Sequence, residues 1–137
     1  MIEVLVAVLL FAIGILGLVG LQASMTNAQT ESKVRSDAAN LVDELAAVMW
    51  SEVGTSIANL SAFKSAGCGG NLRCAAWQTK IGEVLPGGTL DSLAFDETVT
   101  DTSDPNHGMV TVTLKWALPN GSGHQYIATF NVAPSGL

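Results

Sequence analysis

The chain opens with an almost purely apolar stretch. From Val4 to Leu21 every residue is apolar or glycine, and no Asp, Glu, Lys or Arg occurs between Glu3 and Glu31. About 20 such residues are needed to cross the hydrocarbon layer of a membrane as a helix. The continuation from Gln22 to Thr30 is polar but uncharged, so it can extend the span. We therefore expect residues 1–30 to form the hydrophobic, transmembrane half of a helix.

Apolar residues then recur at helical spacing. Their intervals are four, three, four and three, at Val34, Ala38, Leu41, Leu45 and Val48. No proline precedes Pro86, so one helix can run from about Ile2 to about Val53, roughly 75 to 80 Å long. We expect the helix to end at Gly54, because glycine is common just past the C-terminus of a helix. The alternative is a coiled coil, but the stripe covers only about two heptads and lacks regular flanking charges.

The last third of the chain has the period of β-strands. Alternate residues are apolar at Val110, Val112, Leu114, Trp116 and Leu118, which predicts a strand with one buried face. Residues 119–123 form a turn. A partner strand places Tyr126, Ala128, Phe130 and Val132 on one face, and a weaker strand lies around Leu90 to Phe95.

Between helix and sheet we expect a connecting region with a short helix from Ala75 to Leu85. Its apolar side carries Trp77, Ile81 and Val84. A long helix followed by an antiparallel sheet is the element order of an α+β fold. The hundred or so residues after the apolar segment suffice for one core. We therefore expect one globular head over residues 31–137.

The composition and the net charge argue against some classes of function. Only 13% of the residues are charged, against about a quarter in ordinary soluble domains. The net charge is −6, with 12 acidic and 6 basic residues, whereas a nucleic-acid interface needs clustered Lys and Arg. We therefore expect no nucleic-acid partner.

The only two cysteines, Cys68 and Cys74, lie close together in the connecting region. A structural zinc site needs four ligands in paired spacings, and no second pair exists. A redox motif would be more closely spaced. A small-loop disulfide is favoured, because a chain with such an anchor displays its domain outside the cytoplasm.

Catalytic motifs are missing from the sequence. It contains no nucleophile elbow, phosphate loop, dinucleotide fingerprint or zinc-protease helix. His107 and His124 lie in turn sequences, which favours solvent-exposed spacers. The acidic run at residues 96–106 could offer oxygens to calcium, but it lacks the spacing of a helix-loop-helix calcium loop, and a solvated turn is favoured. We expect no enzyme activity, no cofactor and no metal.

Glu3 needs an explanation, because a carboxylate at the edge of hydrocarbon is costly and is usually paired and functional. A secretory signal peptide would open instead with a basic region and carry a shorter apolar core. Two explanations for Glu3 stay open. It caps its own helix dipole from the headgroup region, or it recruits the positive amino terminus of a neighbouring copy during assembly.

The residues at both ends of the chain resemble a known family. The runs Ile2–Ala7 and Ile13–Leu18 are similar to the N-terminal segment of type IV pilins and pseudopilins, and in particular of PilV-type minor pilins. Trp77 with Leu85-Pro86-Gly87-Gly88, and Val110-Thr111-Val112 with Trp116, are similar to PilV-type chains as well. The resemblance implies a type IV pilin-like fold, with a long N-terminal helix packed on a small antiparallel sheet.

The resemblance also implies how such a chain is processed. In that family a prepilin peptidase cuts after a glycine, and the new terminus is usually a methylated phenylalanine, with the glutamate a few residues later. Here an aromatic and one further residue are missing ahead of Met1. We therefore expect Met1 to be an internal residue of the mature protein.

The function implied is that of a minor pilin in the tip or priming complex of a type IV pilus. Its partners would be other minor pilins and the major pilin, contacted through the N-terminal helix with Glu3 as the assembly residue. The chain would sit first in the inner membrane as a single pass with its head in the periplasm, and then in the pilus at the cell surface. Alternatives are a minor pseudopilin of a type II secretion system, a pilus-displayed adhesin or binding module, and a signal-anchored periplasmic enzyme.

Three glycines, Gly14, Gly17 and Gly20, recur at every third position of the apolar half. Each weakens a helix by about 1 kcal/mol relative to alanine. Small residues on one face let helices approach closely in an apolar medium. The resemblance implies a second role, the local unwinding of this stretch when a subunit leaves the membrane for a filament, and both roles can hold.

Overall fold

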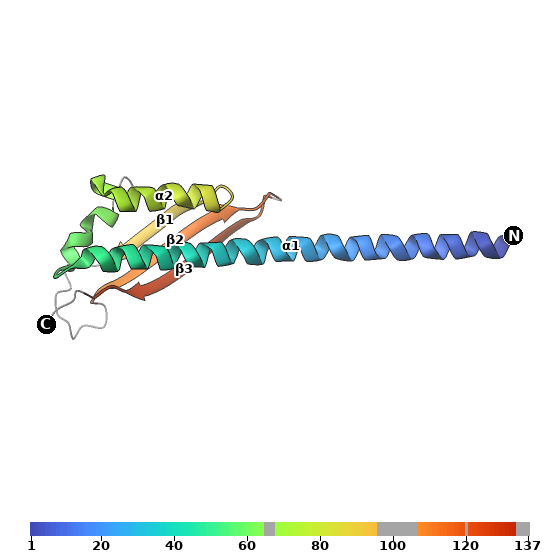
Figure 1. Cartoon of the computed structure of the whole chain (residues 1–137), viewed down its shortest axis with the longest axis horizontal. Helices are drawn as coiled ribbons and strands as arrows, with labels where there is room; N and C mark the ends of the chain where they lie inside the picture. Colours follow the sequence, from blue (N-terminus) through green and yellow to red (C-terminus); the bar gives the residue numbers. More distant parts are fainter. Residues whose placement is uncertain (65–67, 96–106, 120, 134–137) are drawn as a thin grey trace. The chain divides into compact units, whose positions relative to one another are not determined.

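The computed structural model describes residues 1–64, 68–95, 107–119 and 121–133, so the acidic run at 96–106 lies outside the described residues (Figure 1). The elements in chain order are α1 (Ile2–Val53), the 3-10 helices η1 (Ile57–Lys64) and η2 (Cys68–Gly70), α2 (Leu72–Val84), and the strands β1 (Thr89–Phe95), β2 (Met109–Ala117) and β3 (Gly123–Asn131). This α+β order, with a long N-terminal helix packed on a small antiparallel sheet, confirms the predicted fold class. The chain divides into two compact units, Met1–Val34 and Arg35–Leu137.

Helix α1 has the predicted bounds, and Gly54 ends it in the left-handed region at φ +52°. In the second unit its buried side consists of Ala38, Leu41, Val42, Leu45, Met49 and Val53. The predicted stripe is wrong at its last position, because Val48 is partly exposed and Met49 is buried. Spacings of four and three average 3.5 residues, whereas a straight helix turns once every 3.6 residues, so the buried side drifts forward along the sequence.

The three strands form one antiparallel sheet in the order β1-β2-β3. Strand β2 lies at the centre, and its predicted buried face is confirmed at Val110, Val112, Leu114 and Trp116. These residues pair in register with Phe130, Ala128, Tyr126 and His124 of β3. The weaker strand predicted around Leu90 to Phe95 is β1, which carries an irregularity between Leu90 and Ser92 where it pairs with β2.

Helix α2 begins three residues earlier than predicted. Asn71 caps it, because its Oδ1 accepts hydrogen bonds from the backbone N–H groups of Arg73 and Cys74, both at 3.0 Å. The predicted apolar side is also wrong at its end: Val84 is exposed, and the buried position falls on Leu85 just beyond the helix. This places the buried side chains at intervals of three or four residues, at Cys74, Trp77, Ile81 and Leu85.

A buried indole holds α2 beside the second half of α1. Trp77 is 2% exposed, and its Nε1–H donates to the carbonyl oxygen of Leu41 at 2.7 Å. At the surface the Lys80 Nζ lies 2.6 Å from the Glu44 carboxylate across the same two helices. The buried bond fixes the register of the helix pair, whereas the exposed ion pair adds little stability.

The predicted disulfide is present between Cys68 and Cys74, whose Cα atoms lie 5.5 Å apart. Both residues are buried, at 0% and 1% exposure. The bond joins η2 to the first turn of α2, so it pins the start of that helix.

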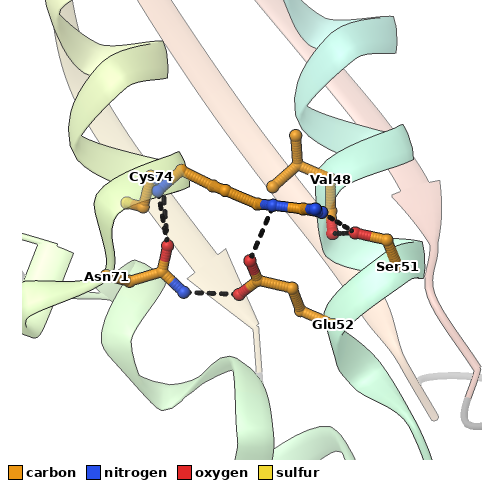
Figure 2. A network of polar contacts seen from close by, with 6 residues as sticks. Val48, Ser51, Glu52, Asn71 and Cys74 are labelled. Carbon is orange, nitrogen blue, oxygen red and sulfur yellow. Dashed lines mark hydrogen bonds and ion pairs between the residues drawn. The ribbon is translucent and has the colours of Figure 1, made fainter.

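A polar network ties this start of α2 to the last turn of α1 (Figure 2). The Asn71 Nδ2 donates to the Glu52 carboxylate, and the Arg73 Nε lies 3.8 Å from Glu52 Oε1. The Arg73 Nη1 also donates to Ser51 Oγ at 2.8 Å, and that hydroxyl donates to the Val48 carbonyl at 2.7 Å. The network and the disulfide therefore act on the same corner of the head.

We expect the disulfide to stabilise the head by about 2 kcal/mol, because closing a loop of this size restricts the unfolded chain. Replacing both Cys68 and Cys74 with alanine should lower the melting temperature of the detergent-solubilised protein, followed by circular dichroism at the head transition. Reductant should lower the melting temperature of the wild type to a similar degree and leave the double variant unchanged. Equal melting temperatures for the wild type, its reduced form and the variant would contradict a stabilising role.

Candidate functional site

The candidate site is the apolar half of α1, within the unit Met1–Val34. An 18-residue window of this helix has a mean hydropathy of 3.0, and none of the window is buried. Exposed apolar patches of this extent mark surfaces that contact a membrane or another protein. Among the described residues one helix, α1, is both long enough and apolar enough to cross a membrane. This finding fits a single-pass anchor.

Glu3 lies in the first turn of α1 and interrupts an otherwise apolar face. It shares this face with Val4, Ala7, Val8 and Phe11. Within the described chain the carboxylate makes no hydrogen bond or ion pair. Its position suits the positive end of its own helix dipole, and its exposure leaves it open to a cation from another molecule. The geometry of one chain is therefore compatible with both explanations for Glu3.

Gly14, Gly17 and Gly20 have open surroundings. A Cβ atom built on any of the three would meet no heavy atom within 4 Å. The chain itself therefore gives no steric reason for glycine at these positions. Two reasons for glycine remain. Its small size lets another helix approach closely, and its low helix propensity lowers the stability of this stretch.

Two threonine hydroxyls in the polar continuation of the apolar half bond to the preceding helical turn. The Thr26 Oγ1 donates to the carbonyl oxygen of Gln22 at 3.0 Å, and the Thr30 Oγ1 donates to that of Thr26 at 2.9 Å. A threonine hydroxyl bonded to the preceding turn needs no water. These residues can therefore follow the apolar stretch into a membrane or a helix bundle with their hydroxyls paired.

The two histidines are not the solvent-exposed spacers that their turn sequences favoured. His107 is buried at 9% exposure, and its carbonyl oxygen accepts from the Asn131 Nδ2 at 2.5 Å. His124 belongs to β3, where its ring stacks on Trp116 with the centroids 6.0 Å apart, and its Nε2 lies 2.9 Å from Ser122 Oγ. The prediction failed because β2 and β3 extend to within a few residues of their connecting turn, which brings His124 opposite Trp116.

The part of the chain that the structure describes contains no group of three or more His, Cys, Asp and Glu side chains that could hold a metal ion. The cysteines, which such a site would use first, are joined to each other. Among protein-family models, curated proteins and solved structures, none matches the chain.

If the three glycines lack contacts within the chain, alanine should be tolerated and should strengthen the helix. We expect Gly17→Ala to slow amide hydrogen exchange in residues 14–20 about fivefold in detergent micelles, the factor that corresponds to about 1 kcal/mol of helix propensity. The matched control is Ala12→Gly, which should speed exchange around residue 12 by a similar factor. Faster exchange in Gly17→Ala would contradict the open surroundings of this glycine.

Proposed function

We propose that this protein is a minor pilin, a non-enzymatic structural subunit that joins the tip or priming complex of a type IV pilus and promotes its assembly. One observation carries the proposal: a single carboxylate, Glu3, stands on the exposed apolar face of a helix long enough to cross a membrane. The α+β fold with a long N-terminal helix and a small antiparallel sheet supports it.

Before assembly the apolar half of α1 anchors the chain in the inner membrane as a single pass, and the head lies in the periplasm. The disulfide between Cys68 and Cys74 supports this placement, because such bonds form and persist in oxidising compartments. Lys33 and Arg35 give too little positive charge to decide the orientation by themselves.

During assembly the helix exchanges lipid contacts for contacts with neighbouring helices. Both surroundings are apolar, so the exchange leaves the hydrophobic surface covered throughout. The open sides of Gly14, Gly17 and Gly20 allow a neighbouring helix to approach closely. The partners are other minor pilins and the major pilin, and a prepilin peptidase processes the chain.

Glu3 favours the bundle over lipid in this exchange, and it sets the axial position of the helix against its neighbour. In a low-dielectric bundle its carboxylate needs a cation, and the amino terminus of an adjacent subunit is the cation that an apolar helix of this kind supplies. Breaking a buried pair by removing one partner costs about 3 to 5 kcal/mol. A subunit without the carboxylate would therefore enter the bundle poorly.

We expect Glu3→Gln to leave the protein expressed and membrane-bound, and to reduce recovery of partner pilins by at least tenfold in pull-downs from detergent-solubilised membranes. Glutamine keeps the size and much of the hydrogen bonding of glutamate but removes its charge. The matched control is Glu31→Gln, which lies on the same helix beyond the uncharged stretch and should recover partners as the wild type does.

Equal recovery with Glu3→Gln and the wild type would falsify the assembly role and leave capping of the helix dipole as the explanation. Loss of Glu3→Gln from the membrane fraction would also contradict the proposal, because the charge is assigned to assembly and not to insertion.

A further inference from the structure

The disulfide holds a residue with an unfavourable backbone conformation. Cys68 lies in the left-handed region at φ +55°, and within the described residues it is the one residue other than glycine with a positive φ. This region is unfavourable for most residues that carry a side chain. Cys68 therefore keeps this conformation only where other contacts hold it. The covalent bond to Cys74, whose Cα atom lies 5.5 Å away, is such a contact.

Asn71 connects the disulfide loop to α1. Its backbone N–H donates to the carbonyl oxygen of Cys68 at 2.8 Å, so the conformation of Cys68 sets the position of Asn71. The Asn71 Oδ1 caps α2 at Arg73 and Cys74, and its Nδ2 donates to the Glu52 carboxylate. Figure 2 shows Asn71 between Cys74 and Glu52. A change at Cys68 therefore reaches the contact between α2 and the last turn of α1.

The two sulfurs are enclosed when this contact is made. Cys68 and Cys74 are 0% and 1% exposed. A disulfide forms or breaks when a thiolate attacks a sulfur directly, so the reagent needs access to it. We call the contact of Glu52 with Asn71 and Arg73, together with the disulfide, the α1–α2 corner. Exchange at either sulfur requires this corner to be open.

We propose that the disulfide is a redox-controlled latch for the α1–α2 corner. In the oxidised chain Cys68 is held at positive φ, and Asn71 caps α2 and binds Glu52. In the dithiol chain Cys68 returns to negative φ, its turn with Asn71 opens, and α2 loses both its cap and its contact with Glu52. The latch lies within the head and does not depend on the function proposed above.

The latch closes by thiol–disulfide exchange with a disulfide-bonded oxidant. One cysteine thiolate attacks the oxidant and forms a mixed disulfide, and the other thiolate then displaces the oxidant. The chain loses two protons and two electrons as the Sγ–Sγ bond forms, and the oxidant leaves as a dithiol. A dithiol reductant reverses both steps. Because the sulfurs are enclosed in the closed corner, oxidation precedes closure.

The first test compares amide hydrogen exchange in the oxidised full chain and in the chain reduced with dithiothreitol, both in detergent micelles. The amides of Arg73 and Cys74, which bond to the Asn71 cap, should exchange about tenfold or more faster after reduction, near the rate of an unfolded chain. The Val112 amide in the central strand is the internal control. In both states it should stay about a hundredfold or more slower than in an unfolded chain.

A matched pair of variants separates the backbone effect from loss of the bond. Cys74→Ala is combined with Cys68→Gly in one variant and with Cys68→Ala in the other, and neither can form the disulfide. Glycine adopts positive φ without strain, so the amides of residues 73 and 74 should exchange about fivefold more slowly in the glycine variant.

The rate of reduction tests the enclosure of the sulfurs. Glu52→Ala removes the carboxylate that binds Asn71 and Arg73, so the corner should open more often. We expect dithiothreitol to reduce this variant about threefold or more faster than the wild type, since opening gives access to the sulfurs. Glu83→Ala, at an exposed position of α2, is the matched control and should be reduced at the wild-type rate.

Four results would overturn the proposal. Equal exchange at residues 73 and 74 in the oxidised and reduced chains would show that the corner closes without the bond. Loss of protection at Val112 on reduction would make the bond a requirement of the whole head and not a latch. Equal exchange in the glycine and alanine variants would show that the bond does not hold a strained residue. Equal reduction of Glu52→Ala and the wild type would show that the sulfurs are reached in the closed corner.

Discussion

The constraint on which the rest of this structure depends is the apolar surface at the start of α1. It must stay away from water, and the protein contains no other segment that covers it in the structure described. The same helix then supplies Ala38, Leu45, Met49 and Val53 to the core of the head. One element thus belongs to two environments, and an uninterrupted helix is the simplest structure that satisfies its own backbone in both.

The first half of α1 is apolar and exposed, whereas its second half, from Arg35 to Val53, contributes to the core of the head. The indole bond from Trp77 to Leu41, the disulfide and the network around Glu52 all connect that part to α2. They concentrate on one side of the head, beside α2 and β1. Strand β3 lies at the other edge of the sheet, where its core side is only partly covered. The stabilised side and the open edge are therefore distinct parts of one small core.

Periodicity alone predicted the elements that extend over many residues. The bounds of α1, the buried face of β2 and the pairing of Cys68 with Cys74 follow from local sequence, and the structure confirms each of them. The failures have local geometric causes. Met49 replaces Val48 because the helix drifts relative to the 4-3-4-3 spacing, and Leu85 replaces Val84 because the chain turns into extended backbone at that point.

Contacts between distant segments could not be read from the sequence. The stack of His124 on Trp116 depends on strand register, and the link from Glu52 to Asn71 depends on how two helices meet. At the candidate site, the exposed apolar helix and the place of Glu3 on it were predictable because they need no tertiary contact. The partner proposed for Glu3 was not, since it would lie on another molecule.

The most direct test asks whether α1 passes from lipid to the outer side of the inner membrane. A single cysteine is introduced at Val8 or at Ser36, and spheroplasts are treated with a membrane-impermeant maleimide. Cys68 and Cys74 remain unreactive because they are joined to each other. We expect labelling of Ser36→Cys in intact spheroplasts, and labelling of Val8→Cys only after solubilisation and denaturation. Protection of Ser36→Cys in spheroplasts, or equal labelling of both positions, would contradict it.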